Sequence, residues 1–335
     1  MAHYRSLRWV TVTATLALAG LAVCLAALFV GSSGMSFDQV TAAFLDKTAS
    51  VQRSIIFDIR LPRIIMGFVV GGALALSGVL LQGMFRNALV EPYTLGISGG
   101  ASLGVCLGVV AGLGRGFAII PLGFMGFAGA FGAILLIYFL NIRGGRINIQ
   151  GLLLGGVMFS FICSSLVMLI MSVARTEDLH GIIFWIMGSL EEPRWAIIKI
   201  TALVSLAGLL AAYIFARDLN ALALGEDEAQ HLGVNVERVK KCLFFIAAIL
   251  TGVSVAGAGI IGFVGLAVPH FVRLRLGSDH RIILIASYLA GGAFLVLCDT
   301  LARTIISPVE LPVGVITGIV GGTLFVAALM RTSRE

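Results

Sequence analysis

The sequence predicts an all-α polytopic integral membrane protein with about ten transmembrane helices per chain. Composition is the first reason: 59% of the 335 residues are hydrophobic, only 12% are charged, and the mean hydropathy is +1.05. Such a chain lacks the polar surface that covers a soluble globule. The second reason is the pattern, because long apolar runs alternate with short charged loops from one end of the chain to the other.

The first half of the chain supplies five of these spans. The run from Trp9 to Val30 follows a basic start, so a cleaved signal peptide is the competing interpretation. It is longer than the usual apolar core of such a peptide, and we expect a retained span. The polar segment 31–60 predicts a short surface helix over 37–45. Spans over 64–83 and after a polar corner at 86–92 form a hairpin, a tight turn follows at 114–116, and two more spans cover 117–140 and 151–173.

The second half is less regular. The apolar run 182–187 is too short to cross and predicts an interfacial helix with an aromatic anchor. Spans follow up to Ala216, over 242–256, over 282–302 and over 313–330. The glycine-rich segment 257–272 predicts a broken or half-length helix that other protein must cover. An even number of helices puts both termini on one side, and the distribution of basic residues puts that side in the cytosol.

Residues that carry chemistry are scarce. No G-x-x-x-x-G-K-[ST] loop is present to hold ATP, and the five cysteines form no C-x-x-C pair. The sequence therefore predicts no enzymatic activity, no cofactor and no metal site. His270 is expected to form a hydrogen bond at a helix end rather than relay protons. Asp299 and Arg303 are spaced i,i+4 and should pair near the end of their helix. No basic cluster is interleaved with aromatic residues, which argues against a nucleic-acid partner.

The longest polar loop, 217–241, has an internal pattern. Acids cluster at 226–228, where they complement the start of a short helix. Gly233 suits the helix end, and a second helix starts near Val236. A solvated loop and a partner-binding element are both compatible with this pattern.

Four motifs resemble a known family. They are RLPR at 60–63, QGMFRNALVEPYTLGISGGA from 82, GFVGLAVPHFVR at 262–273 and ELPVG at 310–314. In this order they resemble the permease subunits of bacterial type II ABC importers, which carry iron-siderophores, haem and vitamin B12. Ala88 departs from the family, which usually has proline there. The resemblance implies a vitamin B12 permease-like fold over 1–335 as a single domain, in the bacterial inner membrane.

The resemblance also implies partners and sites. The partners are a second permease subunit, two ATP-binding cassette subunits that hydrolyse ATP, a periplasmic binding protein and the lipid bilayer. The implied binding-protein contacts are arginines at the outer mouth: Arg60, Arg63 and Arg303. The implied cytoplasmic gate comprises Asn87, Leu89, Ile149 and Gln150. The implied ATPase contacts lie in the 217–241 coupling loop: Leu222, Gly225, Glu226, Glu228, Ala229, Leu232 and Gly233.

Two other classes of function compete with this one. An ion-coupled secondary transporter without an ATPase would need acids inside its spans, and Asp299 beside Arg303 is almost the only candidate. An intramembrane enzyme would need a nucleophile–base or metal pair at span depth, and none is found. The sequence does not choose among siderophore, haem and cobalamin as cargo.

Overall fold

The computed structural model describes residues 2–31, 38–41, 51–113, 122–191 and 194–332, and these are overwhelmingly helical. In chain order the elements are α1 (Ala2–Phe29), α3 (Val51–Ser54), a π-helical turn (Ile55–Arg60), α4 (Leu61–Phe85), a 3-10 turn η2 (Pro92–Leu95), α5 (Ile97–Val110), α6 (Leu122–Asn141), β1 (Ile142–Arg143), β2 (Arg146–Ile147), α7 (Ile149–Val173), α8 (Thr176–Met187), α9 (Trp195–Ile214), α10 (Ala216–Leu222), α11 (Glu226–His231), α12 (Val236–Ala258), α13 (Val264–Leu276), α14 (His280–Thr304) and α15 (Val313–Thr332).

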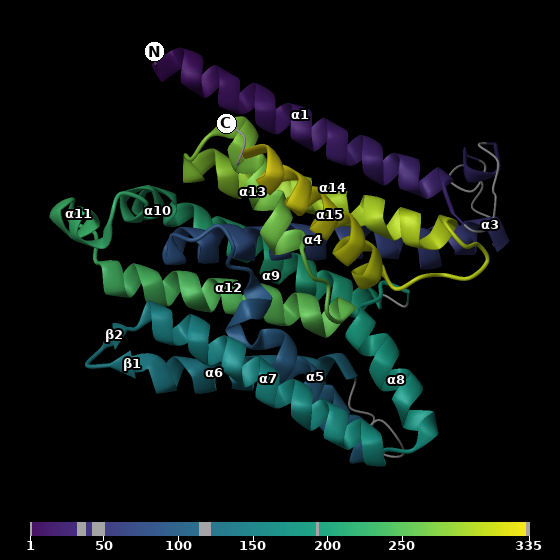
Figure 1. Cartoon of the computed structure of the whole chain (residues 1–335). Helices are drawn as coiled ribbons and strands as arrows, with labels where there is room; N and C mark the ends of the chain where they lie inside the picture. The colour runs from purple at the N-terminus through teal and green to yellow at the C-terminus, as the bar shows by residue number, and fades with distance from the viewer. Residues whose placement is uncertain (1, 32–37, 42–50, 114–121, 192–193, 333–335) are drawn as a thin grey trace.

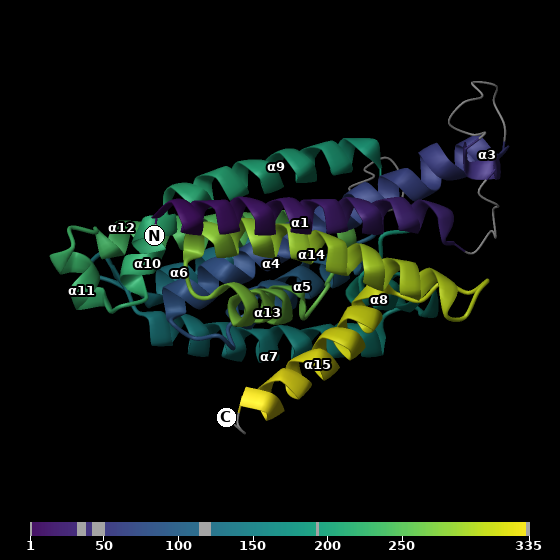
Figure 2. The ribbon, with the colours of Figure 1, turned by 90° about the horizontal axis from the view of Figure 1, so that it is seen from above.

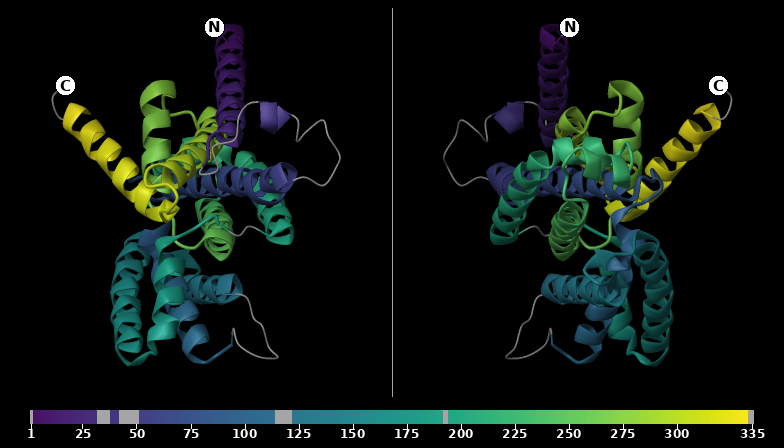
Figure 3. Two further views of the ribbon diagram at one scale, coloured as in Figure 1. Left: turned by 90° about the vertical axis from the view of Figure 1, so that its right-hand side faces the viewer. Right: turned by 90° about the vertical axis from the view of Figure 1, so that its left-hand side faces the viewer.

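Helix α4 is the centre of the molecule. It contacts α14, α12, α13 and α9, and 89% of the most apolar window of the 51–85 helix is buried. End-on views show α5, α6 and α7 grouped on one side of it and α1, α13 and α14 on the other (Figure 3). Glycines make this packing possible. A Cβ on Gly71 would lie 2.3 Å from the carbonyl oxygen of Gly291, so α4 and α14 cross with their backbones nearly in contact.

The number of spans agrees with the sequence. Seven described helices are long and apolar enough to cross a membrane, and α5 and α15 are shorter apolar helices. The tenth is α13, which confirms the expected half-length helix but shifts its boundaries. Helix α12 starts six residues before the predicted Cys242 and continues to Ala258, and a non-helical break over 259–263 precedes α13. Gly259 ends α12 with φ 69°.

Helix α13 contains Pro269, which lacks the N–H that would bond the carbonyl of Gly265. The side chain of Gln82 on α4 supplies the missing donor, because its Nε2 donates a hydrogen bond to the Gly265 carbonyl oxygen at 3.1 Å. The other end of the amide, Oε1, accepts from Arg273 Nη1 at 2.6 Å. A buried glutamine thus satisfies the backbone group that proline releases and ties α4 to α13 at two points.

Three smaller predictions have different outcomes. A helix does cover the predicted interfacial run, as α8, with Ile182 fully buried. Of the predicted surface helix at 37–45, only residues 38–41 are described, and they are helical. The predicted turn at 114–116 lies outside the described residues.

Both ends of the described chain lie at one end of the bundle (Figure 1). The β1–β2 hairpin, α10 and α11 gather at that end, which we call the terminal end. The opposite end carries α3, the α14–α15 connection and one end of α8. From above, α15 splays away from the other helices (Figure 2). The predicted placement of both termini on the same side therefore agrees with the fold.

Candidate functional site

The polar corner after α4 is held by its own backbone and one side chain. Arg86 ends the helix in the left-handed region with φ 52°. The Asn87 side chain accepts from the Leu89 N–H at 2.9 Å, a local turn that does not need a proline at Ala88. Leu89 is 57% exposed and is not covered by the described residues. An apolar side chain at a loop tip is thereby available to a partner.

The start of α7 provides the other predicted gate residues. Asn148 caps the helix, because its Oδ1 accepts from the Gly151 N–H at 3.0 Å. Ile149 is half-buried and Gln150 is exposed. The hairpin before them is fixed by Glu237 of α12, whose Oε2 accepts from the Ile147 N–H at 2.9 Å. This segment is therefore anchored to α12, and its first helical turn faces out.

Residues 216–236 fold as the sequence predicts, into a short helix, a glycine turn and a second helix. Two backbone hydrogen bonds close the C-terminal end of α11. The Gly233 N–H donates to the Gln230 carbonyl oxygen at 2.9 Å, and the Val234 N–H donates to the Ala229 carbonyl oxygen at 3.0 Å. Gly233 has φ 85°, as this termination requires. Gly225, before α11, has φ 145°.

Two of the expected ATPase contacts in this loop need correction, because they are buried. Leu222 and Ala229 are 1% and 0% exposed, because they pack into the main core and hold the loop on the permease. Leu232 is 65% exposed as expected, and Leu224, which sequence reasoning missed, is equally exposed. The acid Glu226 pairs with Lys240 of α12 at 2.5 Å. The loop therefore presents Leu224 and Leu232 on a rigid base.

The three predicted docking arginines are gathered near the opposite end, and all are buried. Arg63 Nε lies 2.8 Å from Asp299 Oδ1, and its Nη1 lies 2.5 Å from Glu310 Oε2. Arg303 Nε lies 3.1 Å from Asp299 Oδ2, which confirms the predicted pair. Arg60 donates to the carbonyl oxygen of Leu28 at 2.5 Å. The side chain of Glu310 is 28% exposed, so it is the accessible member of the cluster.

Two unwound segments meet beside α4, which sequence reasoning did not foresee. The Tyr93 hydroxyl of η2 accepts from the Ile261 N–H in the α12–α13 break at 3.1 Å. Glu91 accepts a hydrogen bond from the backbone of Phe263, the residue that starts α13 with φ 67°. Irregular backbone can lie inside a membrane protein only when such partners satisfy it. The available signal was an acid directly before Pro92, at the end of the polar corner and just before an apolar span.

A cavity of about 330 Å³, which contains several polar side chains, opens between this crossing and α7. Its lining includes Glu91, Thr94 and Ser98 on one side, and Ser160 and Ser164 of α7 on the other. Within the described part of the chain, Ser160 Oγ has no hydrogen-bond partner. The cavity thus offers several hydroxyl groups and one carboxylate beside an otherwise apolar helix.

His270 does not lie where the sequence suggested. It sits in the middle of α13 rather than at a helix end, and its ring packs edge-on against Phe325 of α15 with centroids 5.2 Å apart. Its Nε2 has no hydrogen-bond partner among the described residues. The expected position at a helix end is therefore wrong, because α13 extends past this residue to Leu276.

Comparison with known proteins identifies the family. Residues 5–331 match the model of the FecCD transport family. The chain belongs to this family. It is 38% identical to the hemin transport system permease protein HmuU of Yersinia pestis, over 96% of this chain and 97% of that protein. It is 39% identical to the vitamin B12 import system permease protein BtuC of Klebsiella pneumoniae, over 83% of this chain and 82% of that protein.

A solved structure agrees with the fold of this FecCD-family chain. A metal-chelate type ABC transporter in an inward-facing conformation superimposes with a TM-score of 0.82 at 30% identity, covering 96% of this chain and 99% of that one. The predicted permease class and vitamin B12 permease-like fold are therefore confirmed. The chain is a multi-pass membrane protein of the ABC-importer permease kind.

Proposed function

We propose that the chain is the membrane-spanning subunit of an ATP-driven importer that moves an iron-siderophore or a related chelate, such as haem or cobalamin, from periplasm to cytoplasm. The family match over residues 5–331 carries this proposal. Residues 1–335 would form one permease domain in the bacterial inner membrane, with the terminal end in the cytosol. Relatives of nearly equal identity are named for hemin and for vitamin B12, so identity alone does not choose the cargo.

The working assembly contains two copies of the permease. Support comes from α7, which leaves large apolar side chains uncovered: Phe161 is 66% exposed and Met168 is 71% exposed. Such a face needs either lipid or protein against it. A second copy on α7 would bring the cavity of Glu91 and Ser164 to the subunit interface. Cargo would then pass along hydroxyl groups rather than along lipid.

The cytoplasmic gate would be formed by Asn87 and Leu89 together with Ile149 and Gln150, each meeting its counterpart in the second copy. The exposed tip at Leu89 supports this role. Cysteine at position 89 should form a cross-link between the two subunits in the nucleotide-free state. Cysteine at Gly132, on an open face of α6, is the control and should not. Failure of position 89 to cross-link in every nucleotide state would place the gate elsewhere.

Coupling to the ATPase would use the 217–241 loop. Leu224 and Leu232 supply the apolar contact, while Gly225 and Gly233 fix the turns on either side of α11. Glu226 and Glu228 would keep the start of α11 acidic. The buried side chains of Leu222 and Ala229 would transmit movement of α11 to the core of the permease. Exposed apolar residues on a rigid base are suited to seating in a partner's groove.

Docking of the binding protein would use Arg60, Arg63 and Arg303, but the contacts of Arg63 require an exchange. A carboxylate of the binding protein would replace Glu310 on the Arg63 guanidinium, which can hold a carboxylate with two hydrogen bonds. Glu310→Gln removes the competing charge and should strengthen association severalfold. Weaker association in this variant would argue that Glu310 is itself part of the docking surface.

Transport in proteoliposomes tests the function as a whole. The permease is reconstituted with its ATPase and binding protein, and uptake of a ferric siderophore, haem and cobalamin is followed with ATP inside. We expect uptake of one of these cargos only when ATP and the binding protein are both present. Uptake driven by a proton or sodium gradient without ATP would instead establish the secondary-transporter alternative.

A coupling variant gives the same assay a second readout. Gly233→Val places a β-branched residue at φ 85°, which L side chains rarely adopt, although no atom lies within 4 Å of its Cβ. We expect ATP hydrolysis to continue while uptake falls at least about tenfold, because strain of about 1 to 3 kcal/mol distorts the loop. The control, Gly318→Val, lies in α15 with equally open space. Unchanged uptake in the Gly233 variant would refute the coupling role.

A further inference from the structure

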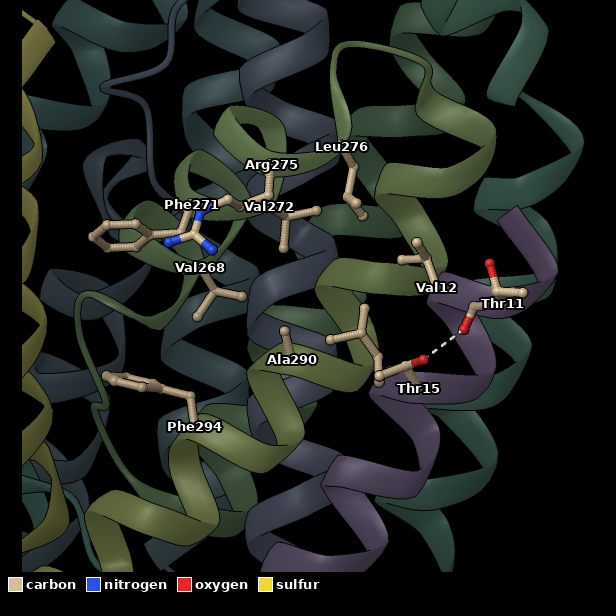
Figure 4. A pocket seen from close by; sticks show the side chains of 11 residues that line it. Thr11, Val12, Thr15, Val268, Phe271, Val272, Arg275, Leu276, Ala290 and Phe294 are labelled. Atoms are coloured by element: carbon tan, nitrogen blue, oxygen red, sulfur yellow. Dashed lines mark hydrogen bonds between the residues drawn. The ribbon is translucent and has the colours of Figure 1, made fainter. Parts of the chain in front are cut away.

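A groove of about 570 Å³ lies between α1 on one side and α13 and α14 on the other (Figure 4). Its walls are almost entirely apolar, with Val12 and Leu16 from α1, Val272 and Leu276 from α13, and Ala290 and Phe294 from α14. All three helices are parts of the membrane-embedded bundle. The groove therefore opens toward the hydrocarbon phase, and its shape suits a chain of methylenes better than a polar ligand.

The length of the groove can be judged along α13. Its lining residues run from Val268 to Leu276, which corresponds to about 12 Å at about 1.5 Å per residue. Half of a hydrocarbon core measures about 15 Å. The groove is therefore long enough to hold most of one acyl chain within a single leaflet.

The end of the groove near the start of α1 has the features of a membrane interface. Trp9 begins the first apolar span, and its ring stacks under the Arg281 guanidinium at 4.8 Å. A second, more polar cavity of about 180 Å³ adjoins this end and shares Val12 and Leu276 with the groove. Tryptophan at such a position is typical of the headgroup level. A lipid in the groove would place its headgroup here.

One cation at this end is unpaired. Within the described residues, Arg275 has no acid within ion-pair distance, and Figure 4 shows its guanidinium turned along α13 toward Val268 and Phe271. The neighbouring arginines are occupied: Arg273 bonds to Gln82, and Arg281 holds Asp279 with two hydrogen bonds of 3.0 and 2.7 Å. The Arg281 bonds hold the pKa of Asp279 well below its usual range, so that pair stays ionised and internally neutral. Because the partner of Arg273 is a neutral amide, neither Arg273 nor Arg275 has an anionic partner among the described residues, and of the two it is Arg275 that lines the groove.

We propose that this groove is a binding site for one anionic phospholipid, whose acyl chain lies along Ala290 and Phe294 and whose phosphate pairs with Arg275. Arg275 is exposed in the last turn of α13, so its guanidinium is accessible to an anion that lies outside the chain. The planar guanidinium of Arg275 can donate hydrogen bonds to two phosphate oxygens at once. The site selects a phospholipid with net negative charge, because a zwitterionic headgroup carries its own compensating cation. It does not depend on the identity of the cargo.

Quenching of Trp9 fluorescence measures occupancy of this site. The chain contains three tryptophans, so Trp185→Phe with Trp195→Phe leaves Trp9 as the only reporter. The full chain is placed in phosphatidylcholine vesicles, and phosphatidylglycerol with brominated acyl chains is added. Brominated phosphatidylcholine serves as the reference lipid. We expect phosphatidylglycerol to be preferred about fivefold, since one basic residue near an anionic headgroup contributes about 1 kcal/mol.

Separate variants test the charge of Arg275 and the open space within the groove. Arg275→Gln should reduce the preference to near one, and Arg275→Lys should restore most of it. Arg238→Gln is the matched control, because Arg238 is exposed in the first turn of α12 and its loss changes the net charge equally. Thr15→Phe, at the exposed rim of the groove, should weaken quenching by both lipids without changing their ratio. Native mass spectrometry of the unmodified chain should show one retained phosphatidylglycerol.

Three results would overturn the proposal. Equal quenching by the two lipids would show that Arg275 does not select the headgroup. A loss of preference in the Arg238 variant equal to that in the Arg275 variant would show a general surface-charge effect. Absence of quenching by either lipid, in protein whose elution volume matches that of the unmodified chain, would show that a second copy or another protein segment covers the groove.

Discussion

Helices α4 and α7 are almost equally apolar but lie in opposite environments. The most apolar stretch of the 51–85 helix, which contains α4, has a mean hydropathy of 2.4, and that of α7 has one of 2.3, yet 89% of the first stretch is buried against 17% of the second. The difference lies in the small residues. Helix α4 carries Gly71, Gly72 and Gly78 on faces that other helices touch, whereas α7 presents Leu154, Phe161 and Leu169 outward. High hydropathy therefore predicts that a helix crosses the membrane, whereas small residues predict where two helices approach each other closely.

The largest expected effect comes from closing the contact between α4 and α13. A Cβ on Gly78 would lie 1.9 Å from the carbonyl oxygen of Gly265, and backbone cannot move aside as a flexible side chain can. Gly78→Val should therefore cost about 3 kcal/mol or more. Thermal unfolding of the purified chain in detergent measures the loss.

The control for this change is Gly132→Val on α6, where no atom lies within 4 Å of an added Cβ. Its melting temperature should stay close to that of the unmodified chain. If the Gly78 variant is as stable as this control, α4 and α13 do not approach as closely as described, and the contrast between the buried and the open helix fails.

A smaller effect on stability is expected when a leucine is truncated, and it should differ between a buried leucine of α4 and an exposed leucine of α7. Leu80 of α4 is fully buried and Leu169 of α7 is 61% exposed. Leu80→Ala should destabilise the chain by about 2 to 5 kcal/mol through loss of packing and the cavity left behind. Leu169→Ala should change stability by less than about 0.5 kcal/mol.

Measuring both leucine variants under monomeric and dimeric conditions sharpens the comparison. If Leu169→Ala destabilises only the dimer, a second copy covers α7, as proposed. If it destabilises the monomer as much as Leu80→Ala does, another part of the same chain covers α7 and the described open face is wrong.

The smallest effect concerns polar contacts. Ser77 of α4 donates to the Ala247 carbonyl oxygen at 3.0 Å and lies 2.8 Å from Thr251 Oγ1. Thr251 also donates to the Ala247 oxygen, so Ser77→Ala leaves that acceptor satisfied. We expect a loss of about 0.6 kcal/mol, typical of one interhelical hydrogen bond in a membrane.

Ser165 of α7 serves as the comparison for Ser77, because it donates only to its own helix, at Phe161 O. Ser165→Ala should leave the denaturation midpoint unchanged. A larger effect at Ser165 than at Ser77 would show that polar contacts do not follow the same division between buried and open helices.

The sequence by itself determined the membrane class, the order of the spans, the presence of a half-length helix within about 257–272 and the glycine turn at Gly233. These depend on apolar run length and on local conformational preferences, which neighbouring residues encode. It also determined the family, because whole motifs such as RLPR and ELPVG survive in order. The pair of Asp299 and Arg303 followed from helical spacing alone.

Only the tertiary structure decided which polar groups meet across helices. Arg63 lies 236 residues from Asp299 in the chain, and Gln82 lies 183 residues from the carbonyl that Pro269 releases. No periodicity relates such positions, since their contact depends on how α4 crosses α13 and α14. The same reason explains why Leu222 and Ala229 face the core while Leu224 and Leu232 are exposed. Burial of a side chain is a property of the neighbours that the fold brings to it, and these neighbours are distant in sequence.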